Sequence, residues 1–177
     1  VIPVREYTDN LYLFMATSKG IVKKSLLCDY DSSRKDGLIA INLDEGDSLI
    51  AVELTSGDDE VLLSTSKGSA IRFSESEIRP MGRATRGVRG ITLDIDDYVV
   101  SMDTVQENGE LLLLSENGYG KRTPMVDFRA THRGGKGVSA LKCNAKTGHL
   151  VAIQAVRAGE EVMIITRKGI VIRTQVD

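Results

Sequence analysis

Aromatic residues are scarce in this chain, which has no Trp, three Phe and five Tyr among its 177 residues. Its core must therefore be built from Val, Ile and Leu, whose side chains suit pleated sheets. Only three prolines accompany 17 glycines, a balance that favours many tight turns over rigid linkers. Hydrophobic residues at 41% and charged residues at 27% exclude wholesale disorder.

Long apolar runs and paired cysteines are also lacking. No stretch could span a bilayer or serve as a signal peptide, so we expect a cytoplasmic chain without membrane contact. Cys28 and Cys143 are far apart, which indicates two reduced thiols. The chain begins at Val1 instead of Met, within an apparent strand, and we expect it to be a piece of a longer protein.

Residue sets for catalysis are missing as well. The sequence has no Gly-x-x-x-x-Gly-Lys-Ser/Thr phosphate-binding loop. His132 and His149 are too few and too far apart for a metal cluster. The acidic runs at 44–47 and 94–97 lack the twelve-residue loop of Ca²⁺ sites, so solvated turns explain them better. We expect no catalytic residues, no metal and no cofactor in this chain.

What the chain does have is internal repetition. A second glycine recurs at Gly37, Gly87 and Gly137, at spacings of 50 residues. Four longer segments resemble one another, and their turn glycines are 48, 50 and 51 residues apart. These segments are LFMATSKGIVKKS (13–25), VLLSTSKGSAIRF (61–73), LLLLSENGYGKRT (111–123) and VMIITRKGIVIRT (162–174), with turn glycines Gly20, Gly68, Gly118 and Gly169.

Each repeat contains four short apolar runs, as at 49–54, 61–65, 69–73 and 88–93, and no sustained helical period. A four-stranded unit of this length is typical of a propeller-like blade, and neighbouring blades must stack to bury their faces. We predict an all-β fold with about three and a half units in one domain, 1–177. The approximate units are 1–48, 49–98, 99–149 and 150–177.

Charge alternates in phase with the repeats, although the net charge is only −2. Residues 42–60 and 92–110 carry no Lys or Arg and seven and six acidic residues. Residues 61–91 and 111–142 carry six basic and two acidic residues each. A circular fold would place the basic halves on one rim, where they suit a polyanion.

The phase holds at single positions. A base follows each turn glycine by four residues, at Lys24, Arg72, Arg122 and Arg173. Equivalent strand positions share one face, which predicts a row of cations for DNA phosphates. The alternative is four local salt bridges to the acidic strands.

Further cations lie beside these bases and in the loops before each second glycine. Glycine there lets the backbone approach a phosphate closely, but a turn that closes a strand explains each glycine equally well. The complete predicted DNA-binding set is Lys23, Lys24, Arg34, Lys35, Arg72, Arg83, Arg86, Arg89, Lys121, Arg122, Arg133, Lys136 and Arg173.

Four stretches carry a family resemblance that extends over essentially the whole chain. They are ATSKGIVKKS (16–25), GLIAINL (37–43), MGRATRGVRGI (81–91) and NGYGKRT (117–123). They closely resemble the C-terminal domain of bacterial DNA gyrase A. The resemblance implies a β-pinwheel whose blades exchange strands, and a basic perimeter that wraps double-stranded DNA to support negative supercoiling.

The same resemblance implies partners and a parent enzyme. The parent would be an ATP-dependent type IIA topoisomerase built from two copies each of gyrase A and gyrase B, with ATP and Mg²⁺ bound elsewhere. Residues 131–137, Thr-His-Arg-Gly-Gly-Lys-Gly, match five positions of the family's Gln-Arg-Arg-Gly-Gly-Lys-Gly heptad. Thr131 and His132 depart from it, so we interpret this segment as a degenerate copy and expect the true heptad upstream.

A second function from another class remains open. A propeller-like protein-interaction module could dock an acidic partner on the same basic rim. The two functions differ in their salt response, because phosphate binding releases counterions and weakens steeply with salt.

Overall fold

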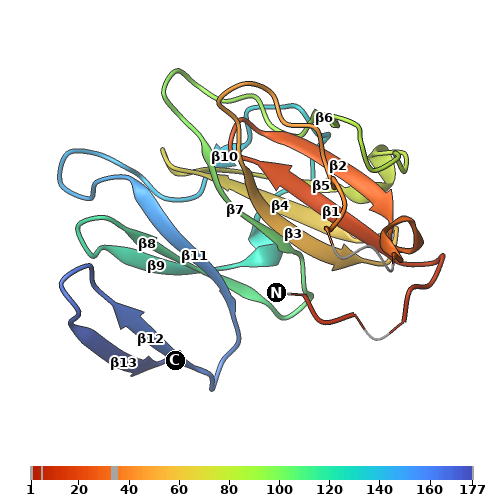
Figure 1. Cartoon of the computed structure of the whole chain (residues 1–177). Helices are drawn as coiled ribbons and strands as arrows, with labels where there is room; N and C mark the ends of the chain where they lie inside the picture. Colours follow the sequence, from red (N-terminus) through yellow and green to blue (C-terminus); the bar gives the residue numbers. More distant parts are fainter. Residues whose placement is uncertain (1, 5, 33–35, 177) are drawn as a thin grey trace.

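A computed structural model of the chain describes residues 2–4, 6–32 and 36–176. Over those residues the fold is all-β, as predicted, with thirteen short strands and three short 3-10 helices (Figure 1). The described residues include no helix long and apolar enough to cross a membrane.

Antiparallel hairpins form at each of the four repeated segments. The glycine in each turn adopts a φ of 80–85°, the left-handed region that side chains disfavour, which explains its recurrence. The hairpins pair β1 (Tyr12–Thr17) with β2 (Ile21–Leu26), β4 (Glu60–Thr65) with β5 (Ser69–Ser74), β8 (Glu110–Ser115) with β9 (Gly120–Pro124), and β12 (Glu161–Ile165) with β13 (Val171–Gln175).

Strands from later repeats complete the sheets of earlier ones. In the first sheet, β3 (Leu49–Thr55) pairs with β1 and β6 (Val88–Arg89) pairs with β2. In the second, β7 (Val99–Thr104) pairs with β4 and β10 (Val138–Ser139) pairs with β5. In the third, β11 (Leu150–Val156) pairs with β8. Contiguous stretches of sequence therefore do not coincide with sheets, which agrees with the strand exchange that the resemblance implied.

The core lies between successive sheets. Phe14 and Phe73, whose ring centroids are 6.5 Å apart, pack with Leu63 between the first and second sheets. Leu62 faces the other way and packs with Leu113 between the second and third. The second sheet is thus covered on both faces, which explains the unbroken apolar run of β4.

A one-turn 3-10 helix follows the first three hairpins: η1 (Leu27–Tyr30), η2 (Glu75–Glu77) and η3 (Met125–Asp127). After η2 and η3 the chain runs outward to β6 and β10, toward the upper part of Figure 1. These two outer segments, residues 79–89 and 129–137, carry many of the predicted cations.

Candidate nucleic-acid interface

The cations that follow the turn glycines occupy equivalent strand positions, as the repeat predicted. In each hairpin the cation pairs across the ladder with an equivalent residue: Phe14 with Lys24, Leu62 with Arg72, Leu112 with Arg122 and Met163 with Arg173. Their side chains, however, already have partners within the protein.

Three of these cations bind an acid on the neighbouring strand of their own hairpin. Arg72 Nε lies 2.9 Å from Glu60 Oε2, and Arg122 Nε lies 3.0 Å from Glu110 Oε2. Arg173 Nε lies 3.1 Å from Glu161 Oε2. The local salt bridges that we kept as an alternative are therefore present. Contact of these arginines with phosphate stays a prediction.

Lys24 has a different environment, because Tyr12 stands where the other hairpins have an acid. Its Nζ lies 5.0 Å from the centre of the Tyr12 ring and 3.8 Å from Glu75 Oε2. It also donates to the carbonyl oxygens of Gly57 and Glu75, at 3.3 and 3.0 Å. The residue is only 4% exposed.

Lys23 is completely buried. Its Nζ donates to the carbonyl oxygen of Ala40, at 2.6 Å, and to that of Arg83. Burial lowers the pKa of Lys23 to about 8, although the charge of Asp29 opposes the shift. Interpreting Lys23 and Lys24 as phosphate contacts is at odds with this placement, because neither ammonium group reaches the surface.

The outer segments present the exposed cations. The Arg86 side chain is 60% exposed and pairs with Asp44 at 2.6 Å, and the equivalent Lys136 is 75% exposed and pairs with Asp94 at 3.4 Å. Such exposed pairs contribute little to stability. Arg89 and Lys121 are also exposed, Arg83 and Arg133 are half-buried, and Arg34 and Lys35 lie outside the described residues.

The predicted set did not include every exposed cation. Arg79 and Arg129 are equivalent exposed residues at the start of the two outer segments. Lys146 is a further exposed cation, and its Nζ lies 5.3 Å from the centre of the Tyr119 ring. Both arginines belong to the loops before a second glycine, where further cations were already predicted from the sequence.

The second glycines are needed where an outer segment joins the preceding sheet. A Cβ at Gly87 would lie 2.5 Å from the Val22 carbonyl oxygen, and one at Gly137 would lie 2.3 Å from that of Ala70. Both have positive φ, 104° and 76°. A side chain at either position would collide with the backbone of the preceding sheet. The turn that closes a strand, which was the alternative to a phosphate contact, thus accounts for Gly87 and Gly137.

The heptad-like segment 131–137 makes backbone hydrogen bonds to the preceding repeat. Gly134 N–H donates to Gly90 O at 2.6 Å, and Thr92 N–H donates to Gly135 O at 2.8 Å. His132 Nδ1 lies 3.3 Å from Glu77 Oε1. These bonds hold Arg133 and Lys136 near the outer segment that carries Arg89, because Arg133 Nη1 donates to the Arg89 carbonyl at 3.0 Å.

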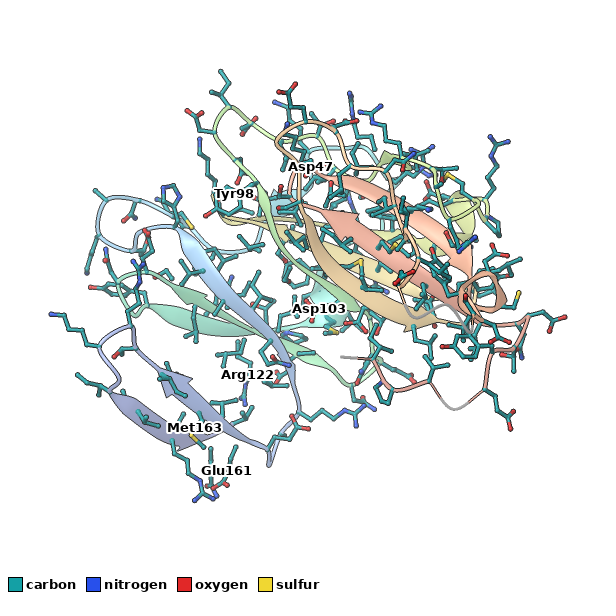
Figure 2. All side chains as sticks on the ribbon, viewed as in Figure 1. Asp47, Tyr98, Asp103, Arg122, Glu161 and Met163 are labelled. Carbon is teal, nitrogen blue, oxygen red and sulfur yellow. The ribbon has the colours of Figure 1, made fainter. Side chains whose placement is uncertain are left out.

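The cysteines and the possible metal ligands do not form a further site among the described residues. Both cysteines are free, and burial raises the pKa of the Cys143 thiol. Over the described part of the chain, no three His, Cys, Asp or Glu residues gather to hold a metal ion. Figure 2 labels Asp47 and Tyr98 on the loops at the upper end of the sheets.

Comparison with known proteins agrees with this architecture. A family model described as the DNA gyrase C-terminal domain, β-propeller, matches residues 11–56, 59–106, 109–157 and 160–177. The DNA gyrase A protein of Ureaplasma parvum is 46% identical over 176 residues, which are 99% of this chain and 21% of that protein. Its counterpart in Pseudomonas aeruginosa is 46% identical over 166 residues, 94% of this chain and 18% of that protein.

Solved structures agree as well. The C-terminal domain of DNA topoisomerase IV superposes with a TM-score of 0.91 at 28% identity, covering 98% of this chain and 55% of that one. A DNA gyrase A C-terminal domain gives 0.83 at 32% identity, covering 96% and 57%. The chain thus spans about a fifth of the curated relatives and somewhat over half of the solved domains. It belongs to the DNA gyrase C-terminal domain family of β-propeller repeats.

Proposed function

We propose that this domain binds double-stranded DNA without sequence preference and wraps it along the two outer segments, 79–89 and 129–137. The observation that carries the proposal is the repeated exposure of cations there, Arg79, Arg86 and Arg89 in one segment and Arg129 and Lys136 in the next. Stacked blades would place such equivalent cations along an arc, and an arc of cations suits a bent duplex.

Within a parent gyrase, the domain would hold DNA beside the DNA-cleaving parts of the enzyme, which gyrase A and gyrase B form together. Wrapping in one direction would then support negative supercoiling, with ATP and Mg²⁺ bound by those other parts. The domain itself would carry no catalytic residue. Membership of the gyrase family supports this role.

The test is the affinity of the chain for several unrelated duplexes of about 40 base pairs across a salt series. We expect a steep salt slope that is the same for every sequence. Replacing Arg79, Arg86 or Arg129 by Ala should reduce the slope by about 0.9 for each lost phosphate contact. Lys168→Ala, an exposed lysine in the turn of the β12–β13 hairpin, is the control and should leave the slope unchanged.

Two results would overturn the proposal. One is a slope that all three arginine substitutions leave unaltered. The other is the absence of duplex binding at low salt together with salt-insensitive binding of an acidic protein, which would favour the protein-docking alternative.

A further inference from the structure

The cations after the turn glycines reach beyond their own hairpins, to the 3-10 turn of the next repeat. Lys24 Nζ donates to the carbonyl of Glu75, the first residue of η2. Arg72 Nη1 donates to the carbonyl of Met125, the first residue of η3, at 3.4 Å. Glu75 and Met125 occupy equivalent positions. The N–H of Glu75 donates to the carbonyl of Asp59, and the N–H of Met125 donates to the carbonyl of Gly109, each just before the first strand of its hairpin.

Arg72 makes the fuller set of contacts. Its Nη1 also lies within hydrogen-bond distance of the carbonyl oxygens of Val126 and Phe128, at 3.5 and 3.2 Å, while its other two nitrogens bind Glu60. The backbone adds to this link, because Thr131 N–H donates to Arg72 O at 2.8 Å. A planar guanidinium can serve an acid and a set of carbonyls at once, which a lysine ammonium cannot match.

Arg122 repeats half of this arrangement. Its Nε binds Glu110, as Arg72 binds Glu60. Its Nη1 is buried and has no hydrogen-bond partner among the described residues. In Arg72 the same atom donates to the carbonyl oxygens of the η3 turn. Val176, whose N–H donates to Glu160 O, occupies the position equivalent to Met125.

We propose that Lys24 and Arg72, the cations four residues after the turn glycines of the first two hairpins, are positioning residues that fix the angle between successive repeats. Each of the two links its hairpin to the turn from which the next outer segment starts, so it determines where the exposed cations of that segment lie. They would set the curvature of the DNA path without touching phosphate. The second half of this inference rests on the proposed function.

Arg72→Gln tests the proposal, because it removes the charge and the fork while keeping a polar side chain. Hydrogen exchange is measured first, without DNA. The amides of residues 125–131 should exchange at least about tenfold faster than in the native chain, while those of β1 and β2 stay unchanged. Arg72→Lys should lie between the two. Arg129→Ala, on the same segment but exposed, is the matched control and should leave exchange unchanged.

The DNA measurement separates positioning from phosphate contact. Arg72→Gln should keep the native salt slope but lower the energy transfer between dyes at the two ends of a bound duplex, as expected for a less regular bend. Arg129→Ala should lower the slope instead. A slope that falls by about 0.9 in Arg72→Gln would show that Arg72 binds phosphate and would overturn the proposal.

Unchanged exchange at residues 125–131 in Arg72→Gln would overturn it too, whether or not DNA binds. If the native chain binds no duplex while the exchange result holds, the proposed function fails, and with it the role in curvature, but the link between repeats stands.

Discussion

Lys23 illustrates at the residue scale how burial changes the role of a charge. Its ammonium lies among carbonyl oxygens in the interior, and its pKa is about 8 against the ordinary 10.5. The unfolded chain therefore binds more protons than the folded one between these two pH values. The contribution of Lys23 to stability is accordingly complete above pH 10.5 and is lost as the pH falls through 8.

The stability of the native chain relative to Lys23→Met should rise between pH 8 and 10.5, by roughly 3 kcal/mol at most. Urea unfolding at a series of pH values measures it, with Lys168→Met at an exposed site as the control. A difference that does not vary with pH would show that Lys23 titrates normally in the folded protein.

Glu75 is a second buried charge, and it is fully satisfied. Its carboxylate accepts hydrogen bonds from Thr55 Oγ1 and from the N–H groups of Gly57 and Asp59, at 2.8–2.9 Å, and it pairs with Lys24. Removing one partner of such a pair leaves the other charge buried without compensation.

We therefore expect Glu75→Ala to destabilise the chain by about 3–5 kcal/mol in denaturant unfolding. Glu107→Ala, at an exposed loop, should change stability by less than about 0.5 kcal/mol. Equal effects of the two substitutions would mean that the ion pair and its hydrogen bonds add nothing to the fold.

At the scale of the element, the hairpin turns distinguish glycines that are needed only for their positive φ from glycines that are also needed for close packing. Gly68 and Gly118 occupy the same turn position with φ of 85° and 80°. A Cβ at Gly68 would lie 2.0 Å from the Leu141 carbonyl oxygen, whereas one at Gly118 would meet no atom within 4 Å. A substitution at Gly118 thus tests the backbone conformation alone, whereas one at Gly68 tests the conformation and the close packing together.

Gly118→Ala should cost about 1–2 kcal/mol, the penalty for a left-handed side chain. Gly68→Ala should cost about 3 kcal/mol more, because the segment around Leu141 must move. Thermal and denaturant unfolding of the two variants give the comparison. Similar losses at both sites would show that the segment moves away easily.

Strands β3 and β7 carry two carboxyl groups that disfavour ionisation. Burial raises the pKa of Asp103, against a lowering hydrogen bond from Ser101. Burial and then the charge of Asp103 raise the pKa of Glu53. Their folded-state pKa values exceed the unfolded ones, so stability present at acidic pH is lost as the pH rises through the folded values.

Asp103→Asn should therefore be more stable than the native chain at neutral pH. This advantage should shrink as the pH falls through the raised pKa of the native carboxyl, and it should be gone below about 4, the ordinary pKa of an aspartate. Asp58→Asn, at an exposed loop, is the control. A native chain that is more stable than Asp103→Asn at neutral pH would contradict the expected sign.

At the scale of the whole molecule, the protection of backbone amides from hydrogen exchange should be greatest in the sheets that other sheets cover on both faces. Five of the six residues of β4 are buried, whereas all five residues of β13 are exposed. Met163, Ile165 and Ile172 of the last hairpin are each more than half exposed. An isolated two-stranded hairpin is marginally stable in water.

Hydrogen exchange should accordingly be slowest in β4 and β5 and fastest in β12 and β13, with β8 and β9 between them. The measurement is a time course resolved to single peptides. Uniform protection from β4 to β13 would instead mean that the repeats open together as one cooperative unit.

The amino-acid sequence alone determined the hairpins, their turn glycines and the phase of the cations. Those features depend on residues a few positions apart, through φ at the turn and the alternation of side chains along a strand. The family motifs likewise lie within short stretches, so the fold class and the family were predictable.

Only the tertiary structure decided which cations are exposed. Lys23 and Arg86 were both predicted to bind DNA from their place in the repeat. Lys23 is buried and donates to the carbonyls of Ala40 and Arg83, whereas Arg86 is exposed to solvent and pairs with Asp44. The carbonyls around Lys23 come from residues 17 and 60 positions away in the chain. Burial depends on neighbours that are distant in the chain, and no local pattern records them.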